Sequence, residues 1–518
     1  MAILAYLIFM YVLLYSISET HGLFDVRPFF IMKRPIWKTN RHSKQNKTFE
    51  YTTLLTQKPT RTTTDIPRRP TTLSPGLKLK YNYQEILLKS MLFYEAQRSG
   101  YLLPNRRIRW RGHSALNDRS EFGEDLTGGW YDAGDHVKFG FTMASATTIL
   151  LWGLVEFREA YEKTGLIKDM LDCVRWPLDY FLKAHTMKYE FYVQVGNPYI
   201  DHSYWTRAED MTMERPAFKV TKENPGSDVV AETAAALAAG AMVFNRTDRL
   251  YATQLQQHAI QLFEFADEYR NKYSDSVPVV REFYPSSGYQ DELTWAAIWL
   301  YRATGMKKYL HYAERNYIGG WVWSFSWDEK EIGSMVLLYN LTRKAKYKRD
   351  LTQILQDWLP GGTLPYTPKG LVYRSSWGVL RYAGNMAFIA LLAAESGLNS
   401  TVYRYWALQQ IHYILGDSGR SYVVGAGHNP PMRPHHAGSS CKVSGPCSWD
   451  DFESKGTNPI ILYGAVVGGP DINDSYIDDR SDFIHNEVTC DYNAGFHSAV
   501  SGICYLLLTH HFPFTKPP

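Results

Sequence analysis

Hydrophobic residues recur at helical spacing along most of the chain after residue 81. Apolar positions at i, i+3, i+4 and i+7 share one face of an α-helix and indicate amphipathic helices. They fall into twelve segments, at residues 83–99, 141–164, 169–187, 227–244, 248–273, 288–304, 306–317, 329–342, 344–358, 378–397, 400–416 and 493–511. Strand-like alternation is scarce, and no strand–helix repeat is present. The pattern predicts an all-α domain.

Several of these segments are apolar on most sides, as in "VVAETAAALAAGAMVF" at 229–244. Such helices need packing partners on two sides. Six helical hairpins closing into an (α/α)6 barrel satisfy this need, although the spacing also allows an open α-solenoid. The loops at 100–140, 190–226, 360–377 and 417–490 are long. Long ordered loops usually carry function, so we expect them to form the site.

The first 23 residues contain an apolar run of the length found in signal peptides. The run lacks a basic start, so a signal anchor is the alternative. We expect a signal peptide at 1–23 and a secreted, extracellular protein. Glycosylation agrees with this route, because Asn-X-Ser/Thr motifs are present at Asn46, Asn245, Asn340, Asn399 and Asn473.

Residues 24–80 form a basic stretch rich in Thr and Pro, with 13 Lys and Arg against three acidic residues. This composition is typical of a disordered or O-glycosylated stem. From residue 81 the balance is −5, and a mildly acidic domain is a poor nucleic-acid binder. We therefore expect one folded domain at 81–518, with no nucleic-acid partner.

The five cysteines do not have zinc-site spacing. Cys441 and Cys447 bracket a short loop that a local disulfide would fix. The odd number leaves at least one thiol free, and the other pairings cannot be deduced.

The stretch "GGWYDAGDHVKF" at 128–139 places Asp132 and Asp135 three residues apart in a turn. Gly134 is expected to let the backbone bend sharply between them. Two carboxylates directed at one water molecule would act as a general base with a helper. The alternative is structural: an Asx-turn and the N-cap of the next helix.

Glu487 lies far away in "DDRSDFIHNEVTCDYNAGF", just before an apolar helix and among aromatic residues. Poorly solvated surroundings raise the pKa of a carboxyl group, as a proton donor near neutral pH requires. The structural alternative is a glutamate that stabilises the first turn of the helix. A base, a distant acid and many aromatic residues in a helical barrel together favour glycosidic bond hydrolysis.

Taken together, these motifs resemble glycoside hydrolase family 9, the endo-β-1,4-glucanases or cellulases, and its secreted animal members in particular. The resemblance covers residues 82–512 and includes "WRGHSALND", "GGWYDAGDHVKF", "ELTWAAIWLYRATG" and "YTPKGLVYRSSWGVLRYAGNMAF". It implies the (α/α)6 barrel and an inverting mechanism. Asp135 is then the general base, Asp132 helps hold the water, and Glu487 is the general acid.

The resemblance also implies a substrate, a β-1,4-glucan of the cellulose type, bound by a monomer. Trp and Tyr rings suit the C–H faces of such a chain. Any single ring can instead belong to the core, and Trp321 and Trp327 compete with Trp323 for its role. The matching cleft positions are His202, Trp205, Trp323, Trp377, Tyr382, His435 and Tyr492.

A structural calcium ion is the cofactor that the resemblance implies. Oxygen ligands from a turn and from carboxylates suit a hard cation. The alternative for the acidic pair Asp291 and Glu292 is the first turn of a helix. The matching positions are Ser287, Gly288, Asp291, Glu292 and Asp328.

Two departures from the family pattern stand out. Ala437 occupies a cleft position where the family has arginine, and His113 occupies one where it has aspartate. Arginine offers a fork of donors that alanine lacks, so we expect altered binding of sugar hydroxyls. A catalytically weak β-glucan-binding protein on the same fold, or a hydrolase of mixed-linkage β-glucan or glucomannan, is the alternative. Retention of Asp132, Asp135 and Glu487 favours the enzyme.

Overall fold

The structure is a computed structural model that describes residues 79–513. The expected signal segment and nearly all of the expected stem, residues 1–78, lie outside the described residues. These two predictions, and the domain boundary near residue 80, therefore stay predictions.

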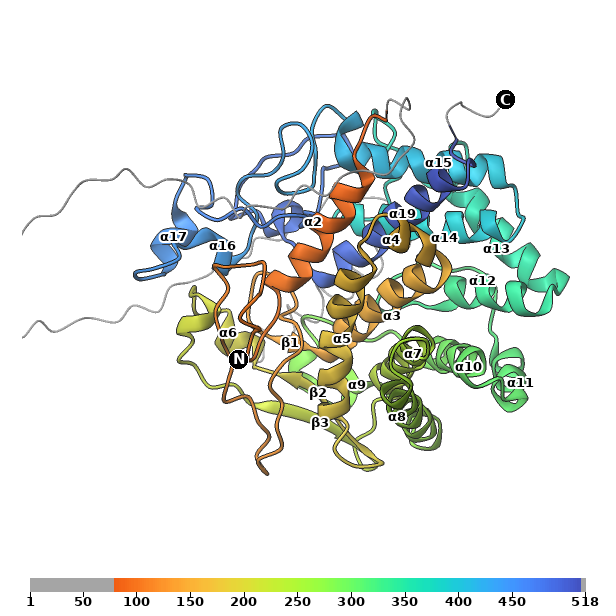
Figure 1. Cartoon of the computed structure of the whole chain (residues 1–518), viewed down its shortest axis with the longest axis horizontal. Helices are drawn as coiled ribbons and strands as arrows, with labels where there is room; N and C mark the ends of the chain where they lie inside the picture. The colour runs from red at the N-terminus through yellow and green to blue at the C-terminus, as the bar shows by residue number, and fades with distance from the viewer. Residues whose placement is uncertain (1–78, 514–518) are drawn as a thin grey trace, which may run out of the picture. The chain divides into compact units, whose positions relative to one another are not determined.

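Six helices form a closed inner ring. Each inner helix packs against the next, and the last returns to the first, so the ring has no open edge (Figure 1). This closure confirms the barrel and eliminates the open solenoid. The ring consists of α3 (Gly140–Glu156), α7 (Ser227–Phe244), α10 (Gln290–Thr304), α12 (Glu331–Thr342), α14 (Val379–Glu395) and α19 (Cys490–Leu508).

Each inner helix has an outer partner that covers it. The outer helix α13 buries only one stripe, at positions i, i+4, i+7, i+8 and i+11 from Tyr347, whereas the outer helix α2 is buried on most sides. Inner helices are buried on nearly all sides, and α7 shows this most clearly. The outer helices are α2 (Tyr83–Ala96), α5 (Ile167–Ala184), α8 (Arg249–Glu268), α11 (Lys307–Asn316), α13 (Ala345–Trp358) and α15 (Ser400–His412).

Helix α7 is the one helix in residues 79–513 that is long and apolar enough to cross a membrane. Its apolar window is 94% buried within the protein. The apolarity of α7 therefore reflects its place in the inner ring.

A small antiparallel sheet was not expected from the sequence. Strands β1 (Lys138–Phe139), β2 (Glu190–Val195) and β3 (Ala217–Thr221) pair in that order, with Lys138 opposite Val195 and Phe191 opposite Val220. Strand β1 lies directly between the Asp132–Asp135 turn and α3. The sheet therefore holds the end of that turn in place.

Short helices occupy the long loops. They are α4 (Arg158–Lys163), α6 (Pro198–Asp201), α9 (Tyr273–Ser276), α16 (Ala437–Ser440), α17 (Trp449–Glu453) and α18 (Phe483–Asn486). Single turns of 3-10 or π type span Ala208–Asp210, Pro278–Val280 and Tyr413–Asp417.

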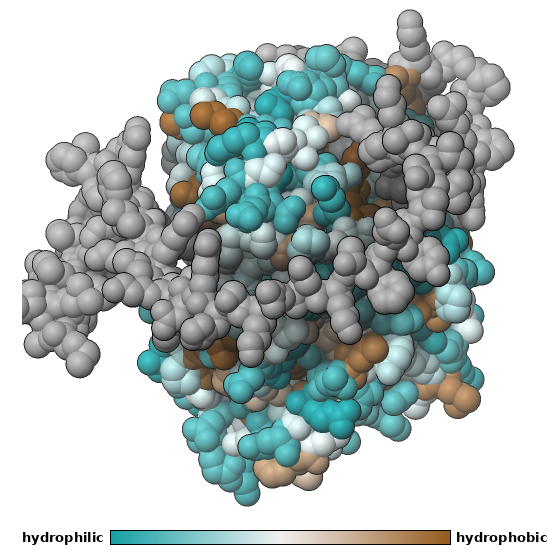
Figure 2. Space-filling view, turned by 90° about the vertical axis from the view of Figure 1, so that its left-hand side faces the viewer, coloured by the Kyte–Doolittle hydropathy of each residue, from teal (hydrophilic) through white to brown (hydrophobic). Residues whose placement is uncertain are grey.

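The hairpin repeat makes all six inner helices run in the same direction. Their N-terminal ends follow the long loops, and most of their C-terminal ends lead into short turns such as 245–248, 305–306, 343–344 and 396–399. On the face drawn in Figure 2, hydrophilic residues predominate and the hydrophobic ones form separate patches. The polar chemistry discussed next lies at the N-terminal end of the ring.

Candidate active site

The turn that carries the two aspartates is fixed from both sides by backbone hydrogen bonds. The Asp132 amide donates to the Val137 carbonyl at 3.0 Å, which closes the turn. The Cys490 amide, the first of α19, donates to the Asp132 carbonyl at 2.9 Å. The turn before α3 is thus attached to the segment that carries Glu487, although some 350 residues separate them.

The chain bends at residues 133–136, as expected, and glycine at position 134 is required for a second reason as well. Its backbone lies outside the left-handed region, but a Cβ there would be 2.4 Å from the His435 carbonyl oxygen. The Ala437 amide donates to the Gly134 carbonyl at 2.9 Å. Glycine therefore permits the close approach of the 435–437 loop to the turn.

Asp132 is buried and accepts hydrogen bonds from the Thr142 hydroxyl and from the Tyr284 hydroxyl. Burial raises the pKa of Asp132 to about 8, and the negative charge of Asp135 acts in the same direction. The two hydroxyl donors oppose this rise. A raised pKa lets Asp132 hold a proton near neutral pH, which relieves the repulsion between the aspartates.

Asp135 is engaged by α6. The His202 Nε2 atom lies 3.1 Å from its carboxylate, and the neighbouring Asp201 accepts the His136 amide at 3.1 Å. Burial disfavours protonation of His202, but the hydrogen bond and charge of Asp135 outweigh it and raise the His202 pKa. Helix α6 therefore contacts the turn through two adjacent side chains.

Glu487 lies at the C-terminal end of α18, three residues before α19. Its carboxylate is 3.4 Å from Trp377 Nε1 and 3.4 Å from the Tyr492 hydroxyl. Burial raises its pKa to about 7, and the charge of Asp135 adds to the rise. Such a group is protonated at neutral pH yet close to releasing its proton, which suits a general acid.

The contacts of these carboxylates differ from those of helix caps, which were the structural alternative. Helix α3 begins after Phe139, which provides no side-chain cap, so neither aspartate caps it. The N-cap of α19 is Thr489, whose side chain accepts the Tyr492 amide. Coulombic coupling links Glu487 to both Asp132 and Asp135. The charge of Asp135 therefore acts on both Asp132 and Glu487, which places the three carboxyl groups in one electrostatic environment.

The aromatic positions differ in exposure. Trp377 is 46% exposed beside Glu487, whereas Tyr382 and Tyr492 are buried. Trp323 packs edge-on against Tyr382 at 4.7 Å and lies under the Arg374 guanidinium at 4.3 Å. Of its two competitors, Trp327 packs inside against Phe141 and Tyr284, and Trp321 is 74% exposed.

Trp205 and His435 form a second aromatic group, with ring centroids 5.2 Å apart. Trp205 is nearly buried and donates to Ser440 at 2.9 Å. His435 donates from Nδ1 to the Arg480 carbonyl at 2.8 Å, so its Nε2 is an acceptor. Burial lowers the pKa of His435 to about 4, which keeps its ring neutral.

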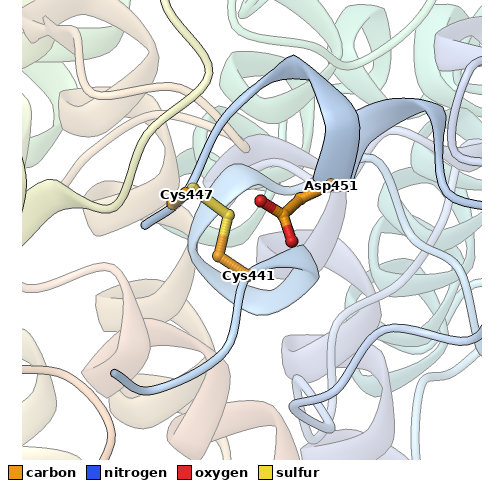
Figure 3. Close-up of side chains that lie close together, drawn as sticks. All are labelled: Cys441, Cys447 and Asp451. Atoms are coloured by element: carbon orange, nitrogen blue, oxygen red, sulfur yellow. A yellow bond between two sulfur atoms is a disulfide. The ribbon is translucent and has the colours of Figure 1, made fainter. Parts of the chain in front are cut away.

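Two clusters in residues 79–513 bring three potential metal ligands within 4.8 Å of one another. One is Cys441, Cys447 and Asp451, but the two cysteines form the predicted disulfide (Figure 3). Asp451 belongs to the capping box of α17. The other is Asp135, Asp201 and His202, which the contacts above already account for. Cys173, Cys490 and Cys504 are buried free thiols.

The residues expected to bind calcium gather before α10 and α12. The Asp328 carboxylate accepts the Ser287 amide at 2.8 Å, and Asp291 accepts the Lys330 amide at 2.7 Å. Both carboxylate oxygens of Glu292 are buried without a hydrogen-bond partner in the described chain. Burial and the charge of Asp291 raise the Glu292 pKa well above its usual value. An unpartnered carboxylate among other acids fits a hard cation.

Sequence reasoning missed several side chains that support the site. Thr142 and Tyr284 bind Asp132, and Asp201 holds the His136 amide. Arg381 forms an ion pair with Asp491 at 2.9 Å behind Tyr382. Only Asp201 could have been found from the local sequence, because it directly precedes the predicted residue His202. The other side chains are far in sequence from the groups that they contact.

The sequence profile of glycosyl hydrolase family 9 matches residues 83–500. The chain belongs to this family. It is 46% identical over 448 residues to endoglucanase A of Bacillus pumilus, covering 82% of this chain and 67% of that protein. It is 52% identical to a structure of an endoglucanase from the termite Nasutitermes takasagoensis (TM-score 0.81; 83% and 100% coverage). A C. cellulolyticum cellulase in complex with cellobiose is 33% identical (TM-score 0.76; 82% and 99%).

The two departures from the family 9 pattern have distinct surroundings. Ala437 is buried against Trp205 and Cys441, and its amide still holds Gly134. Arg433, the nearest replacement by sequence, donates to the Lys455 carbonyl at 3.3 Å. His113 accepts the Leu102 amide through Nδ1 at 2.9 Å. A carboxylate can accept such a bond too, which explains why histidine is tolerated there.

Proposed function

We propose that the protein is an inverting endo-β-1,4-glucanase that acts on cellulose-type β-glucans. The observation that carries the proposal is the placement of Glu487, with its pKa raised to about 7, before α19 and coupled to Asp135 before the adjacent helix α3. Relatives named as endoglucanases and a related cellulase bound to cellobiose support the substrate.

In this mechanism Asp135 removes a proton from a water molecule as its oxygen attacks the anomeric carbon. Glu487 donates its proton to the departing glycosidic oxygen. An inverting enzyme keeps acid and base about 6.5–9.5 Å apart so that the water fits between base and sugar. Asp132, held by Thr142 and Tyr284, orients that water, and His202 positions Asp135.

The cleft positions take the roles that the resemblance implies. Trp377 lies beside the acid, where its ring can stack on a glucose unit. Trp323 and Tyr382 form an edge-to-face pair, and His435 offers an acceptor at Nε2 to a sugar hydroxyl. Trp205 supports the His435 ring from behind, and Tyr492 donates to Glu487.

A structural calcium ion is part of the proposal. Asp291, Glu292 and Asp328 would hold it together with carbonyl oxygens of Ser287 and Gly288. Bound there, it would neutralise the carboxylates before α10 and α12 and stabilise the loops that lead into the cleft. The proposal also includes secretion, glycosylation, a monomer, and no nucleic-acid or membrane partner once the signal segment is cleaved.

The test is hydrolysis of carboxymethylcellulose and lichenan, followed by reducing-sugar release and by the anomeric form of the first products. We expect α-anomeric reducing ends from a β-linked substrate, because a single displacement inverts the anomeric carbon. β-anomers would contradict inversion. The departures at Ala437 and His113 leave open the alternative of a catalytically weak β-glucan-binding protein. Retention on β-glucan gels without any sugar release would establish that alternative.

A further inference from the structure

A cavity lies at the other end of the barrel. Its volume is about 390 Å³, within the ~300–1,000 Å³ that small-molecule sites span. The C-terminal ends of α3, α10, α12, α14 and α19 supply its lining. Leu341 and Arg343 at its border are exposed, so it opens to solvent.

Two polar atoms in this lining lack hydrogen-bond partners in the described chain. Arg302 donates one guanidinium nitrogen to Glu156 at 2.7 Å, but its Nη1 is buried and unpaired. The Oδ1 atom of Asn340 is also buried and unpaired. One cavity thus contains an unpaired hydrogen-bond donor and an unpaired acceptor. Buried polar groups without partners lower the free energy of unfolding, so a ligand that pairs with both would stabilise the protein.

The rest of the lining points to a neutral, polar ligand with an apolar face. Two arginines, Arg302 and Arg343, balance two glutamates, Glu156 and Glu395. Apolar surface comes from Phe157, Leu337, Leu392 and the ring of Tyr505. A sugar ring matches this combination, because its hydroxyl groups both donate and accept while its C–H face packs on aromatic side chains.

Asn340 is itself a possible attachment point for such a sugar ring. It begins the motif Asn340–Leu341–Thr342, an acceptor sequence for N-glycosylation. Its Nδ2 atom makes no hydrogen bond in the described chain and is absent from the unpaired buried atoms, so it remains accessible. The motif and the cavity therefore coincide at one side chain.

We propose that Asn340 carries an N-linked glycan whose first N-acetylglucosamine occupies this cavity. The Asn340 Nδ2–C1 bond forms, during synthesis of the chain, as the bond from C1 to a lipid-linked pyrophosphate breaks and the amide loses one proton. The acetamido group of the sugar donates to Asn340 Oδ1 and accepts from Arg302 Nη1, and its methyl group packs on Phe157. The inference rests on the proposed secretory route.

Asn399 provides a matched control for Asn340. It is exposed, it precedes α15 in a turn at the same end of the barrel, and its motif is Asn399–Ser400–Thr401. Thr342→Val removes the first motif without changing Asn340; it also removes two local bonds of the Thr342 hydroxyl, which donates to the Leu338 carbonyl and accepts from the Lys344 amide. Thr342→Ser keeps that motif, and Thr401→Val removes the second.

The experiment uses the full chain secreted from eukaryotic cells. Glycopeptide mass spectrometry should find both Asn340 and Asn399 occupied, and native N-glycosidase should release the Asn340 glycan about tenfold more slowly, because burial of its first sugar requires local opening. Thr342→Val should lower Tm by about 1–2 °C, as expected for losing one or two hydrogen bonds in a large domain. Thr342→Ser and Thr401→Val should not.

The Tm difference between bacterially expressed wild type and Thr342→Val, both without glycans, measures the loss of the two Thr342 hydroxyl bonds alone. Only a larger difference in the secreted pair is the effect of the sugar. Occupancy of Asn399 with an empty Asn340 would overturn the inference and leave secretion intact. Two empty sites would overturn the inference and would contradict the proposed glycosylation at both asparagines. If Asn340 is empty and added cellobiose or N-acetylglucosamine stabilises wild type but not Asn340→Ala, the cavity takes a free sugar and the covalent assignment is wrong.

Discussion

The two ends of the helix ring differ in both loop length and charge. The N-terminal end carries the long loops, the buried carboxyl groups of Asp132 and Glu292, and the half-buried ones of Asp328 and Glu487. The C-terminal end has short turns, with Arg302 in the last turn of α10 and Arg343 just after α12.

Helix dipoles give this difference a physical basis. Six parallel helices place partial positive charge at one end of the ring and partial negative charge at the other. The first end tolerates clustered carboxyl groups and the second attracts cations. The dipoles therefore favour a cluster of carboxyl groups at the end where the long loops place Asp132, Asp135 and Glu487.

The largest effect is expected when one carboxyl group is removed, in separate variants, from each end of the ring. Glu487→Gln should lower kcat on carboxymethylcellulose by about 10²–10⁴-fold, because amide cannot donate the proton that general acid catalysis requires. Glu395→Gln, at the opposite cavity, should leave kcat unchanged, since Glu395 pairs only with Arg404 near the surface. Equal losses in the two variants would contradict the assignment of Glu487.

A smaller effect is expected when the approach of two loops is blocked. Gly134→Ala places a methyl group 2.4 Å from the His435 carbonyl, so the 435–437 loop must move. Displacement of about 1 Å at a catalytic group can cost 10²-fold in rate. Gly456→Ala, which meets nothing closer than 3.6 Å, is the control. Retained activity in Gly134→Ala would show that the 435–437 loop can move without displacing the catalytic groups.

The pH dependence of kcat/KM reports the acid directly. The Tyr492 hydroxyl donates to Glu487 and lowers its pKa. Tyr492→Phe removes this donor, so the pKa should rise and Glu487 should remain protonated to higher pH. The alkaline limb of the profile, near pH 7 in the wild type, should therefore move upward. A limb that stays in place would assign it to another group.

The mildest effect concerns the proposed calcium ion. A ligand at 100 times its Kd stabilises the folded state by about 2.7 kcal/mol. Calcium should therefore raise the Tm of chelator-treated protein, with little change in kcat. Glu292→Gln should reduce the response, and Glu314→Gln on the outer helix α11 should keep it. A full rise of Tm with calcium in Glu292→Gln would show that the ion binds at another site.

The sequence predicted the helices better than it predicted the site. All twelve segments became barrel helices, because apolar periodicity records the buried face of each helix locally. The partners of Asp132 could not be predicted: Tyr284 lies about 150 residues away and meets it only in the closed ring. The bend at Gly134 was predicted correctly. The close approach of the 435–437 loop to Gly134 could not be predicted, because that loop is remote in sequence.

The closed ring also brings the two ends of the described domain together. Tyr83, at the start of α2, has its ring centroid 6.0 Å from that of Phe512, just beyond α19. A short linker could therefore join these ends, and new termini could be opened in a turn such as 305–306. Such a circular permutant would keep every helix pair and yet synthesise the acid before the base. The architecture of the closed ring therefore does not require that Asp135 precede Glu487 in the sequence.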